Sequence, residues 1–209
     1  QMFKQIPNSR VVYGFSRAAT RVRSAPGACC VYEERVRGVL QPPALAMRDE
    51  QLHVCDEGSL NGVFIRIKGP TDVHHGDEIR VGQELLRFES ISGDANAAPD
   101  GTRLYGSAAH GAWGRLVSVT AANDHGDAHL LRDEEAVLGR SSGDMTFPDD
   151  AFVSSTHCKV TRRGKGAQLT DLGSSNGTYL KIRGPIAVSH GDLLLLGQQL
   201  FQVQTNRPG

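Results

Sequence analysis

The sequence predicts an all-β protein made of two β-sandwich domains in tandem, and three observations support this prediction. Val, Leu and Ile occur in short runs separated by clusters of Gly, Asp, Asn or Ser, which is typical of short strands joined by tight turns. No segment of helical length carries the apolar spacing of an amphipathic helix, so a parallel sheet with crossover helices is disfavoured. Two stretches of the first half also recur in the second half, which indicates two copies of one domain.

The internal repeat is defined by two matches at a single offset. Residues 56–63 (DEGSLNGV) match residues 171–178 (DLGSSNGT), and residues 74–89 match residues 189–204, both at an offset of 115 positions. Two independent matches at one offset are not expected by chance, so we treat the two copies as a first and a second repeat.

The stretch between the two repeats sets the expected domain boundaries. Residues 92–101 (SGDANAAPDG) have the small and polar composition of a linker. We therefore expect a first domain at 1–92, a linker at 93–112 and a second domain at 113–209.

The composition limits the classes of partner. The chain of 209 residues carries 23 basic and 23 acidic side chains, so bulk charge does not favour nucleic acid or a membrane surface as a ligand. The run of leucines at 193–196 is far too short to cross a bilayer, and the first residues lack the pattern of a signal peptide. We therefore expect a cytoplasmic protein without membrane insertion.

The cysteine and histidine pattern predicts neither a metal site nor a cofactor. The cysteines lack the paired spacing of a zinc site and are expected to be small, buried apolar residues. They are Cys29, Cys30, Cys55 and Cys158. His74 and His75 stand beside Asp77, but a similar turn recurs at residues 189–192, which favours a structural role.

The second repeat shows its strands and turns most clearly. Strands are expected from residue 113 onward and at 128–131, 135–138, 157–161, 167–170, 178–182, 193–196 and 200–203. Successive turns of antiparallel strands alternate between the two ends of a sheet. The serine-rich turns at 154–157 (SSTH) and 173–177 (GSSNG) should therefore meet at one end. The basic turn at 162–166 (RRGKG) should lie at the other end, as a solvated hairpin turn or a weak patch for an acidic partner.

The ordered motifs of the second repeat resemble a forkhead-associated (FHA) domain over roughly residues 113–205. The resemblance is carried by Gly139 with Arg140, Ser154 with His157, residues 174–178, and Gly191 with Asp192 before a final apolar strand. It implies a β-sandwich whose loops at one end bind peptides that contain phosphothreonine.

The residue chemistry supports the site that the resemblance implies. Arg140 offers a planar fork of donors that suits the charge and geometry of a phosphate. The hydroxyl of Ser154 can donate a further bond, and Ser155 and Ser175 can supply hydroxyl or backbone N–H donors. The resemblance assigns Asn176 to the main chain of the peptide. Many FHA domains carry arginine where this chain has Ser155, so Arg140 is expected to be the main cationic anchor.

Three further residues are expected to support the binding loops. Gly139 and Gly177 allow backbone angles or close approaches that other residues resist. His157 stands at the position of a structural histidine that, in FHA domains, braces the loops.

The first repeat lacks most of the expected pocket. Leu60 stands where the second repeat has Ser175, and Arg23 matches Arg140 only with a shift of two positions. Apolar residues replace the serines and the histidine of the SSTH turn, namely Val39, Leu40 and Pro42. Because a phosphate without donors is costly to desolvate, the first domain is not expected to bind phosphothreonine. It is expected to pack on the second domain, to form a homo-oligomer, or to dock a partner without phosphate.

These features predict a signalling adaptor that reads phosphothreonine peptides through its second domain. Its partners would be substrates of a Ser/Thr kinase, or such a kinase. The alternative is an interaction or oligomerisation scaffold that works without phosphate. No catalysis is expected: GSSNG fits the G-x-S-x-G pattern of serine hydrolases, but the following TYLKI favours a strand over the helix that this pattern requires.

Overall fold

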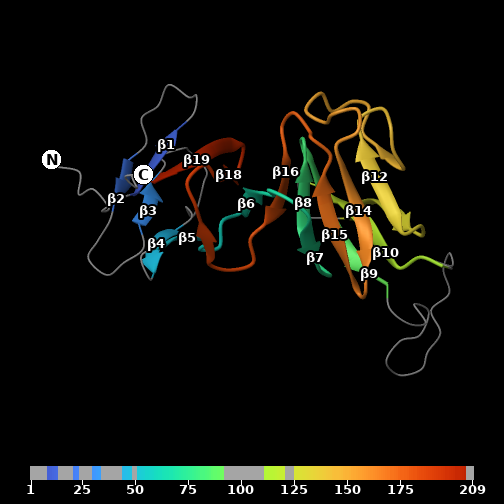
Figure 1. Ribbon diagram of the computed structural model, residues 1–209, viewed down its shortest axis with the longest axis horizontal. Coiled ribbons are helices and arrows are strands. Elements are labelled where there is room, and N and C mark those ends of the chain that lie inside the picture. Colours follow the sequence, from blue (N-terminus) through green and yellow to red (C-terminus); the bar gives the residue numbers. More distant parts are fainter. Residues whose placement is uncertain are drawn as a thin grey trace. The chain divides into compact units, whose positions relative to one another are not determined.

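The computed structural model shows strands and turns, and no helix, in the part of the chain that it describes (Figure 1). This part comprises residues 9–13, 21–23, 30–33, 44–48, 51–91, 111–120 and 125–205. The all-β prediction is therefore confirmed. The same residues contain no helix that is long and apolar enough to span a membrane.

The chain divides into two compact units. Unit 1 consists of Gln1–Arg66 and Lys181–Gly209, and unit 2 consists of Ile67–Leu180. The strands of unit 2 are β7 (Thr71–Val73), β8 (Glu78–Val81), β9 (Glu84–Ser90), β10 (Gly114–Val119), β11 (His125–Leu131), β12 (Glu135–Gly139), β13 (Met145–Thr146), β14 (Cys158–Arg163), β15 (Gly166–Asp171) and β16 (Thr178–Lys181).

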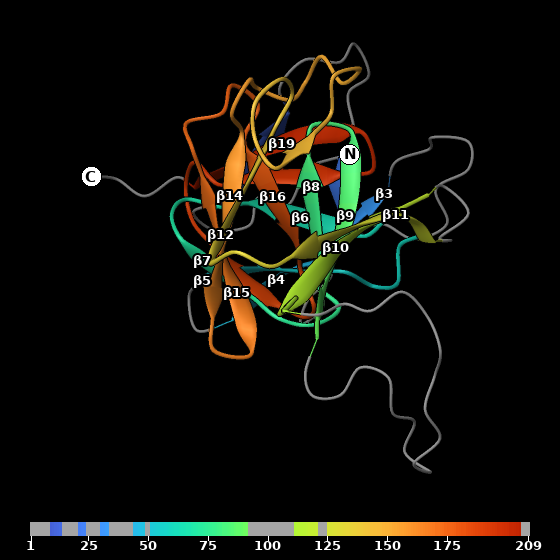
Figure 2. The same cartoon turned by 90° about the vertical axis from the view of Figure 1, so that its right-hand side faces the viewer.

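Unit 2 is a sandwich of two sheets. One sheet has the strand order β16-β8-β9-β10-β11, and the other has the order β13-β12-β14-β15-β7. Figure 2 shows β12, β14 and β15 in one layer and β8, β9 and β10 in the other. Since side chains alternate along a strand, every second residue points inward. Both sheets contribute to one core, which includes Ile79, Leu86, Phe88, Leu116, Leu138, Val160 and Leu169.

Unit 1 also contains two sheets and its own core. Its strands are β1 (Ser9–Tyr13), β2 (Arg21–Arg23), β3 (Cys30–Glu33), β4 (Ala44–Arg48), β5 (Gln51–Cys55), β6 (Val63–Arg66), β17 (Ile186–Val188), β18 (Leu193–Leu196) and β19 (Gln199–Thr205). The sheet orders are β1-β19-β18-β6 and β17-β5-β4-β3-β2. Its core includes Leu52, Val54, Val63, Val188, Leu194, Phe201 and Val203.

The strands predicted for the second repeat are confirmed. They correspond to β10, β11, β12, β14, β15, β16, β18 and β19. Two strands of that repeat, β13 and β17, were not predicted from the sequence. They are two and three residues long, and so few residues carry no readable alternation.

The compact units differ from the predicted domain boundaries at 1–92 and 113–209. Unit 2 joins β7 to β9 of the first repeat with β10 to β16 of the second, and unit 1 joins β1 to β6 with β17 to β19. The physical reason is strand pairing, because β7 pairs with β15, β8 with β16 and β9 with β10. The predicted linker at 93–112 lies outside the described residues, apart from its last two.

The repeated histidine turns are structural, as expected. The carboxylate of Asp77 accepts the backbone N–H of His74 at 2.8 Å, and Asp192 accepts the N–H of Ser189 at 2.8 Å. Of the cysteines, Cys158 is fully buried and Cys55 is half-buried. Cys29 and the side chain of Cys30 lie outside the described residues.

Candidate functional site

Three loops of unit 2 meet at one end of the sandwich. The loop after β12 is joined to the SSTH turn by the backbone N–H of Arg140, which donates to the carbonyl of Ser154 at 2.8 Å. The GSSNG turn is joined to the same place by the N–H of Ser175, which donates to Oγ of Ser154 at 3.0 Å. The prediction that the two serine-rich turns meet is therefore confirmed.

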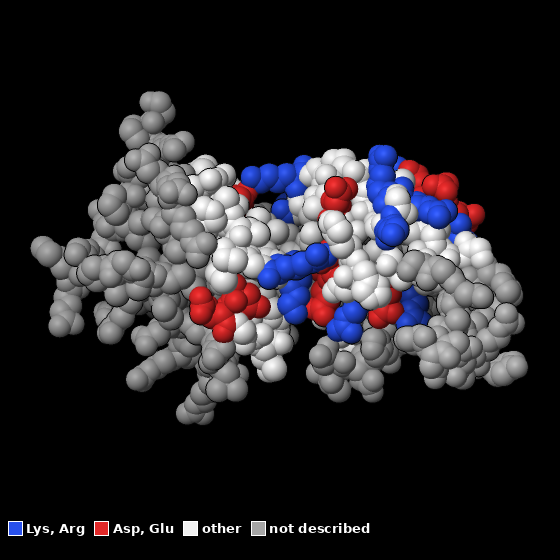
Figure 3. Space-filling view, turned by 90° about the horizontal axis from the view of Figure 1, so that it is seen from below, with Lys and Arg blue, Asp and Glu red and all other residues white. Residues whose placement is uncertain are grey.

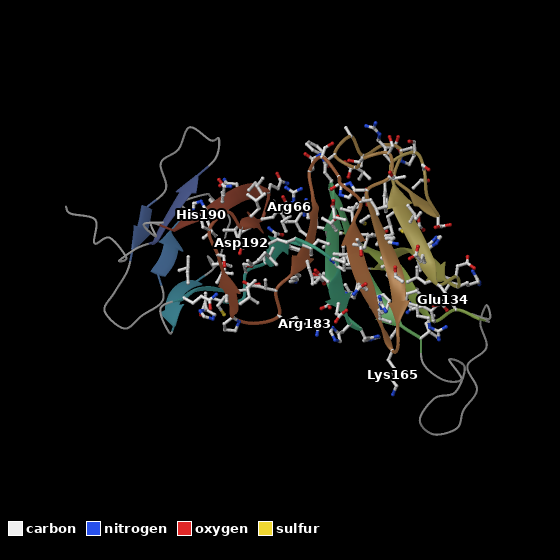
Figure 4. The ribbon with its side chains drawn as sticks, viewed as in Figure 1. Arg66, Glu134, Lys165, Arg183, His190 and Asp192 are labelled. Carbon is white, nitrogen blue, oxygen red and sulfur yellow. The ribbon has the colours of Figure 1, made fainter. Side chains whose placement is uncertain are left out.

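The basic turn lies at the opposite end of unit 2, as predicted. Figure 4 shows Lys165 at the tip of the β14–β15 turn, away from the loops that follow β12. Of its neighbours, Arg162 lies 3.7 Å from the acidic Glu134, and Arg163 donates a hydrogen bond to the neutral amide of Gln168. On the face drawn in Figure 3, Lys and Arg side chains lie among Asp and Glu side chains. This mixture favours a solvated hairpin turn over a patch for an acidic partner.

Gly139 ends β12 at a point where no side chain fits. A Cβ atom there would lie far inside the van der Waals distance of two carbonyl oxygens, those of Ser155 and Ser142. Ser142 in turn donates its N–H to the carbonyl of Ser155 at 3.1 Å. The glycine thus lets the two loops approach closely enough to be joined by backbone hydrogen bonds.

His157 joins the two serine-rich turns from the interior of unit 2. Its side chain is fully buried, its Nδ1 accepts the backbone N–H of Ser154 at 3.0 Å, and its Nε2 lies 3.1 Å from the carbonyl of Gly177. Since an N–H can only donate and a carbonyl can only accept, the ring is neutral with its proton on Nε2. Both ring nitrogens are therefore engaged in holding the loops.

Replacing His157 by Ala should destabilise the protein by about 3 kcal/mol, because it leaves two buried polar groups without a partner and opens a cavity. The loss should appear as a lower unfolding temperature. His74→Ala is the matched control, because that side chain is 67% exposed. Equal unfolding temperatures for the two variants would contradict this role of His157.

Ser154 lies at the junction of the three loops. Its N–H, its carbonyl and its hydroxyl oxygen each take part in a hydrogen bond, with His157, Arg140 and Ser175 respectively. Because the hydroxyl oxygen accepts the N–H of Ser175, the hydroxyl hydrogen remains available to donate to an anion.

Ser155 and Ser175 are both exposed at the rim of the loops. The backbone N–H of Ser175 is already used by Ser154, so only its hydroxyl can serve a ligand. In the described part of the chain, neither the hydroxyl nor the N–H of Ser155 has a partner. Ser155 can therefore offer two donors and Ser175 one.

Ser175 lacks the surroundings of a hydrolase nucleophile. It is followed by strand β16 and not by a helix. The nearby His157 is committed through both nitrogens to Ser154 and Gly177, so it cannot act as a base for Ser175.

Asn176 fixes the backbone of the neighbouring loop. Its side-chain Nδ2 donates to the backbone carbonyl of Phe152 at 2.8 Å, and its backbone carbonyl accepts the hydroxyl of Tyr179 at 3.2 Å. The side-chain oxygen of this exposed residue is left to accept a hydrogen bond from a ligand.

Arg140 brings a cation to the same loops. The residue is half-exposed, and its guanidinium has no ion-pair or hydrogen-bond partner among the residues that the structure describes. Within the described ranges its hydrogen bond is made by the backbone N–H, so the side chain is available to an anion.

The GSSNG turn is held by a half-buried carboxylate, Asp171, whose role was not predicted from the sequence. Asp171 accepts hydrogen bonds from the N–H groups of Gly173 and Ser174 and from the hydroxyls of Ser174 and Thr178. Burial alone raises the pKa of Asp171, but these four bonds together lower it below the ordinary value, so the group is ionised at neutral pH. The signal available in the sequence was the spacing Asp-x-x-Ser, which is typical of a side chain that caps its own turn.

The equivalent loop of the first repeat keeps only part of this support. The N–H of Ser59 donates to Asp56 at 2.8 Å, but the buried hydroxyl of Ser59 has no hydrogen-bond partner among the described residues. Leu60, at the position of Ser175, is 79% exposed. The other replacements (Val39, Leu40, Pro42 and the side chain of Arg23) lie outside the described residues.

Comparison with known proteins identifies the family of this site. A sequence profile of the FHA domain matches residues 136–197, so the chain contains an FHA domain. A second, degenerate copy is not matched in this way and stays a prediction.

The similar proteins cover only part of the chain. It is 32% identical over 85 residues to the oxoglutarate dehydrogenase inhibitor of Corynebacterium jeikeium (strain K411), which covers 40% of this chain and 59% of that protein. It is 27% identical over 93 residues to the FHA domain-containing protein FhaB of Mycobacterium tuberculosis (strain ATCC 25618 / H37Rv), which covers 43% and 60%. The chain thus spans about three fifths of the length of these curated relatives. A solved structure of Mycobacterium tuberculosis EmbR in complex with a low affinity phosphopeptide matches 55% of this chain and 28% of its own, with 21% identity and a TM-score of 0.27.

Proposed function

We propose that the FHA domain of this chain binds phosphothreonine peptides, and that the protein acts as a signalling adaptor without catalysis of its own. The observation that carries this proposal is the position of Arg140, whose guanidinium has no partner among the described residues, on a loop that backbone hydrogen bonds join to a rim of serines. The residues that would hold the phosphate are Arg140, Ser154, Ser155 and Ser175.

The donors at this rim suit a phosphate. A phosphorylated side chain carries nearly two negative charges and three acceptor oxygens at neutral pH. The guanidinium of Arg140 can donate two parallel bonds, while the hydroxyls of Ser154 and Ser175 can each donate one. Charge-assisted bonds contribute about 1.5–3 kcal/mol each before ordering costs, so three or four support micromolar affinity, about −8 kcal/mol.

Asn176 would fix the register of the peptide. Its Nδ2 is held by the carbonyl of Phe152, which leaves its Oδ1 as the group that faces a ligand. An amide oxygen in this orientation accepts an N–H from the main chain of a bound peptide, so Asn176 would select the backbone beside the phosphothreonine and not its charge.

Direct binding is the decisive measurement. The full chain would be titrated by calorimetry with a library of phosphothreonine peptides and with the same peptides lacking phosphate. We expect micromolar binding that requires the phosphate. Equal binding of both forms would instead support the alternative, a protein-interaction scaffold that works without phosphate.

A comparison of phosphothreonine with phosphoserine peptides tests whether this domain shares the preference for phosphothreonine that the resemblance to FHA domains implies. The resemblance implies an apolar niche for the γ-methyl group, and a buried methyl contributes about 0.8 kcal/mol, or roughly fourfold in affinity. We therefore expect a phosphothreonine peptide to bind at least about fourfold more tightly than its phosphoserine twin. Identical dissociation constants in the same calorimeter would show that this niche is absent.

The first repeat would not bind phosphothreonine. Its loop at 56–62 carries Leu60 in place of a hydroxyl donor. An exposed leucine at this position suits packing on another domain, self-association or a partner that lacks phosphate, and these alternatives stay open. The partners of the FHA domain would be proteins phosphorylated by a Ser/Thr kinase, or the kinase itself.

A further inference from the structure

The strand pairing in each unit joins the two repeats. In unit 2, β15 pairs with β7 and places Gln168 opposite Asp72; in unit 1, β5 pairs with β17 and places His53 opposite Ala187. His53 and Asp72 lie 115 positions before Gln168 and Ala187, so the two ladders are equivalent. Each ladder therefore contains one strand from each repeat.

A second pair of ladders shows the same exchange. β16 pairs with β8 in unit 2, and β6 pairs with β18 in unit 1. These strands are again related by the 115-residue offset. The second half of the first repeat thus completes the sandwich that carries the FHA site.

The β8–β9 turn of the first repeat is hydrogen-bonded through Asp150 to the loop between β13 and β14. This loop, at residues 147–157, carries Ser154 and is called the phosphate-binding loop below. This buried carboxylate accepts the N–H of Gln83 at 2.6 Å with one oxygen and the N–H of Phe152 at 2.8 Å with the other. The carbonyl of Asp150 also accepts the N–H of Val153 at 3.2 Å. These hydrogen bonds hold the backbone of residues 150–153, and Ser154, the central serine of the site, follows directly.

The space around Gly82 shows how closely the turn and the loop are packed. A Cβ atom at Gly82 would lie 2.5 Å from Oδ2 of Asp150 and 2.7 Å from Cγ2 of Val153. The charge of Asp150 also acts on Glu84, the residue that follows the turn. Burial raises the pKa of Glu84, and the charge of Asp150 raises it further, while Arg80 lowers it.

We infer that Asp150 and the turn at Gly82 and Gln83 position the phosphate-binding loop, so that the first repeat builds part of the site of the second. This inference rests on the proposed phosphothreonine function. It assigns the first repeat a role at the site although that repeat has lost its own phosphate donors. The sandwich of unit 2 is then completed by residues 67–91 of the first repeat, although the FHA profile match extends to residue 197 of the second.

Two equivalent glycines provide a matched test. Gly82 and Gly197 occupy the same turn in the two repeats with φ angles of 61° and 60°, so Ala strains the backbone equally at both. At Gly197, however, the nearest heavy atom to a Cβ would be Nδ2 of Asn61 at 3.9 Å. We expect Gly82→Ala to weaken phosphothreonine-peptide binding about tenfold or more, and Gly197→Ala to leave it within about twofold.

Gly82→Ala should also lose more thermal stability than Gly197→Ala, because only its added methyl group collides with Asp150 and Val153. Both affinities would therefore be measured well below the unfolding temperature of the less stable variant. Weaker binding by Gly197→Ala, with Gly82→Ala unaffected, would show that each repeat completes its own sandwich and would overturn the inference. Equal affinities for both variants would also overturn it.

Engineered cysteine pairs test the exchange without any ligand. Opposite residues of an antiparallel pair have Cβ atoms about 4.5–5.5 Å apart, within reach of a disulfide or a short thiol cross-linker. We expect Asp72→Cys with Gln168→Cys to cross-link within one chain, and Gln168→Cys with Ala187→Cys to stay unlinked. The buried thiol of Cys158 should not interfere, because burial raises its pKa to about 12.

The cross-linked positions would be identified by mass spectrometry after digestion. A link between residues 168 and 187 would overturn the exchange, as would a 72–168 link found only in covalent dimers. If no phosphothreonine peptide binds the wild-type chain, the proposed function fails, while the cysteine pairs still decide how the units are built.

Discussion

Arg140→Ala should abolish measurable binding of phosphothreonine peptides. In the proposed site, the guanidinium of Arg140 would be the cation that meets the phosphate, and it can donate two parallel charge-assisted bonds. Their loss corresponds to about 3–6 kcal/mol, which is more than 100-fold in affinity and moves a micromolar complex beyond the range of calorimetry. The effect is expected to be especially large because Ser155 supplies no second cation.

The fold of this variant should remain intact, since among the described residues Arg140 makes its hydrogen bond through the backbone N–H and not through the side chain. Its unfolding temperature should match that of the wild type. Arg162→Ala is the matched control: it removes an exposed arginine at the opposite end of unit 2 and should leave the affinity unchanged. Arg140→Lys should bind weakly, because lysine keeps the charge without the planar fork. Full affinity of Arg140→Ala would disprove the assigned site.

Gly139→Ala should separate the loops that form the site. The added methyl group would collide with the carbonyl oxygens of Ser155 and Ser142, which belong to the backbone and cannot rotate away. The loops must therefore move apart and break the hydrogen bond between Ser142 and Ser155. We expect a loss of about 2–3 kcal/mol in the free energy of unfolding, as for other overpacked positions, together with a loss of peptide binding.

Chemical denaturation with peptide titration would measure both effects. Gly69→Ala is the control, because a Cβ atom there meets nothing within 4 Å and the residue belongs to the same unit. A Gly139→Ala variant with the stability and affinity of the control would mean that the loops are looser than the structure shows.

The sequence was sufficient to predict the strands and the meeting of the two turns. Short apolar runs and polar turns specify strands locally, and alternation of turns between sheet ends places SSTH beside GSSNG. It did not reveal the role of Asp150, because that role depends on Gln83 in the other repeat. The bonds of Asp171, by contrast, are local, and the spacing Asp-x-x-Ser was the signal for them.

The division of donors at the rim also required the structure. From the sequence, Ser154 was expected to donate through its hydroxyl, and Ser155 and Ser175 through a hydroxyl or a backbone N–H. In the fold, the N–H of Ser175 is used by Ser154, and the amide of Asn176 is used by Phe152. A donor that is already hydrogen-bonded within the protein is not available to a ligand, and the three-dimensional contacts are needed to tell which donors these are.

The sequence by itself determined that the chain contains two repeats of a β-rich pattern and that the second carries the residues of an FHA site. Only the tertiary structure decided which half-repeats combine. The segments at 74–89 and 189–204 have the same turn and the same inward alternation, so either could complete either sandwich by local rules. Strand partners are chosen by long-range packing, and here β7, β8 and β9 of the first repeat pair with the strands of the second.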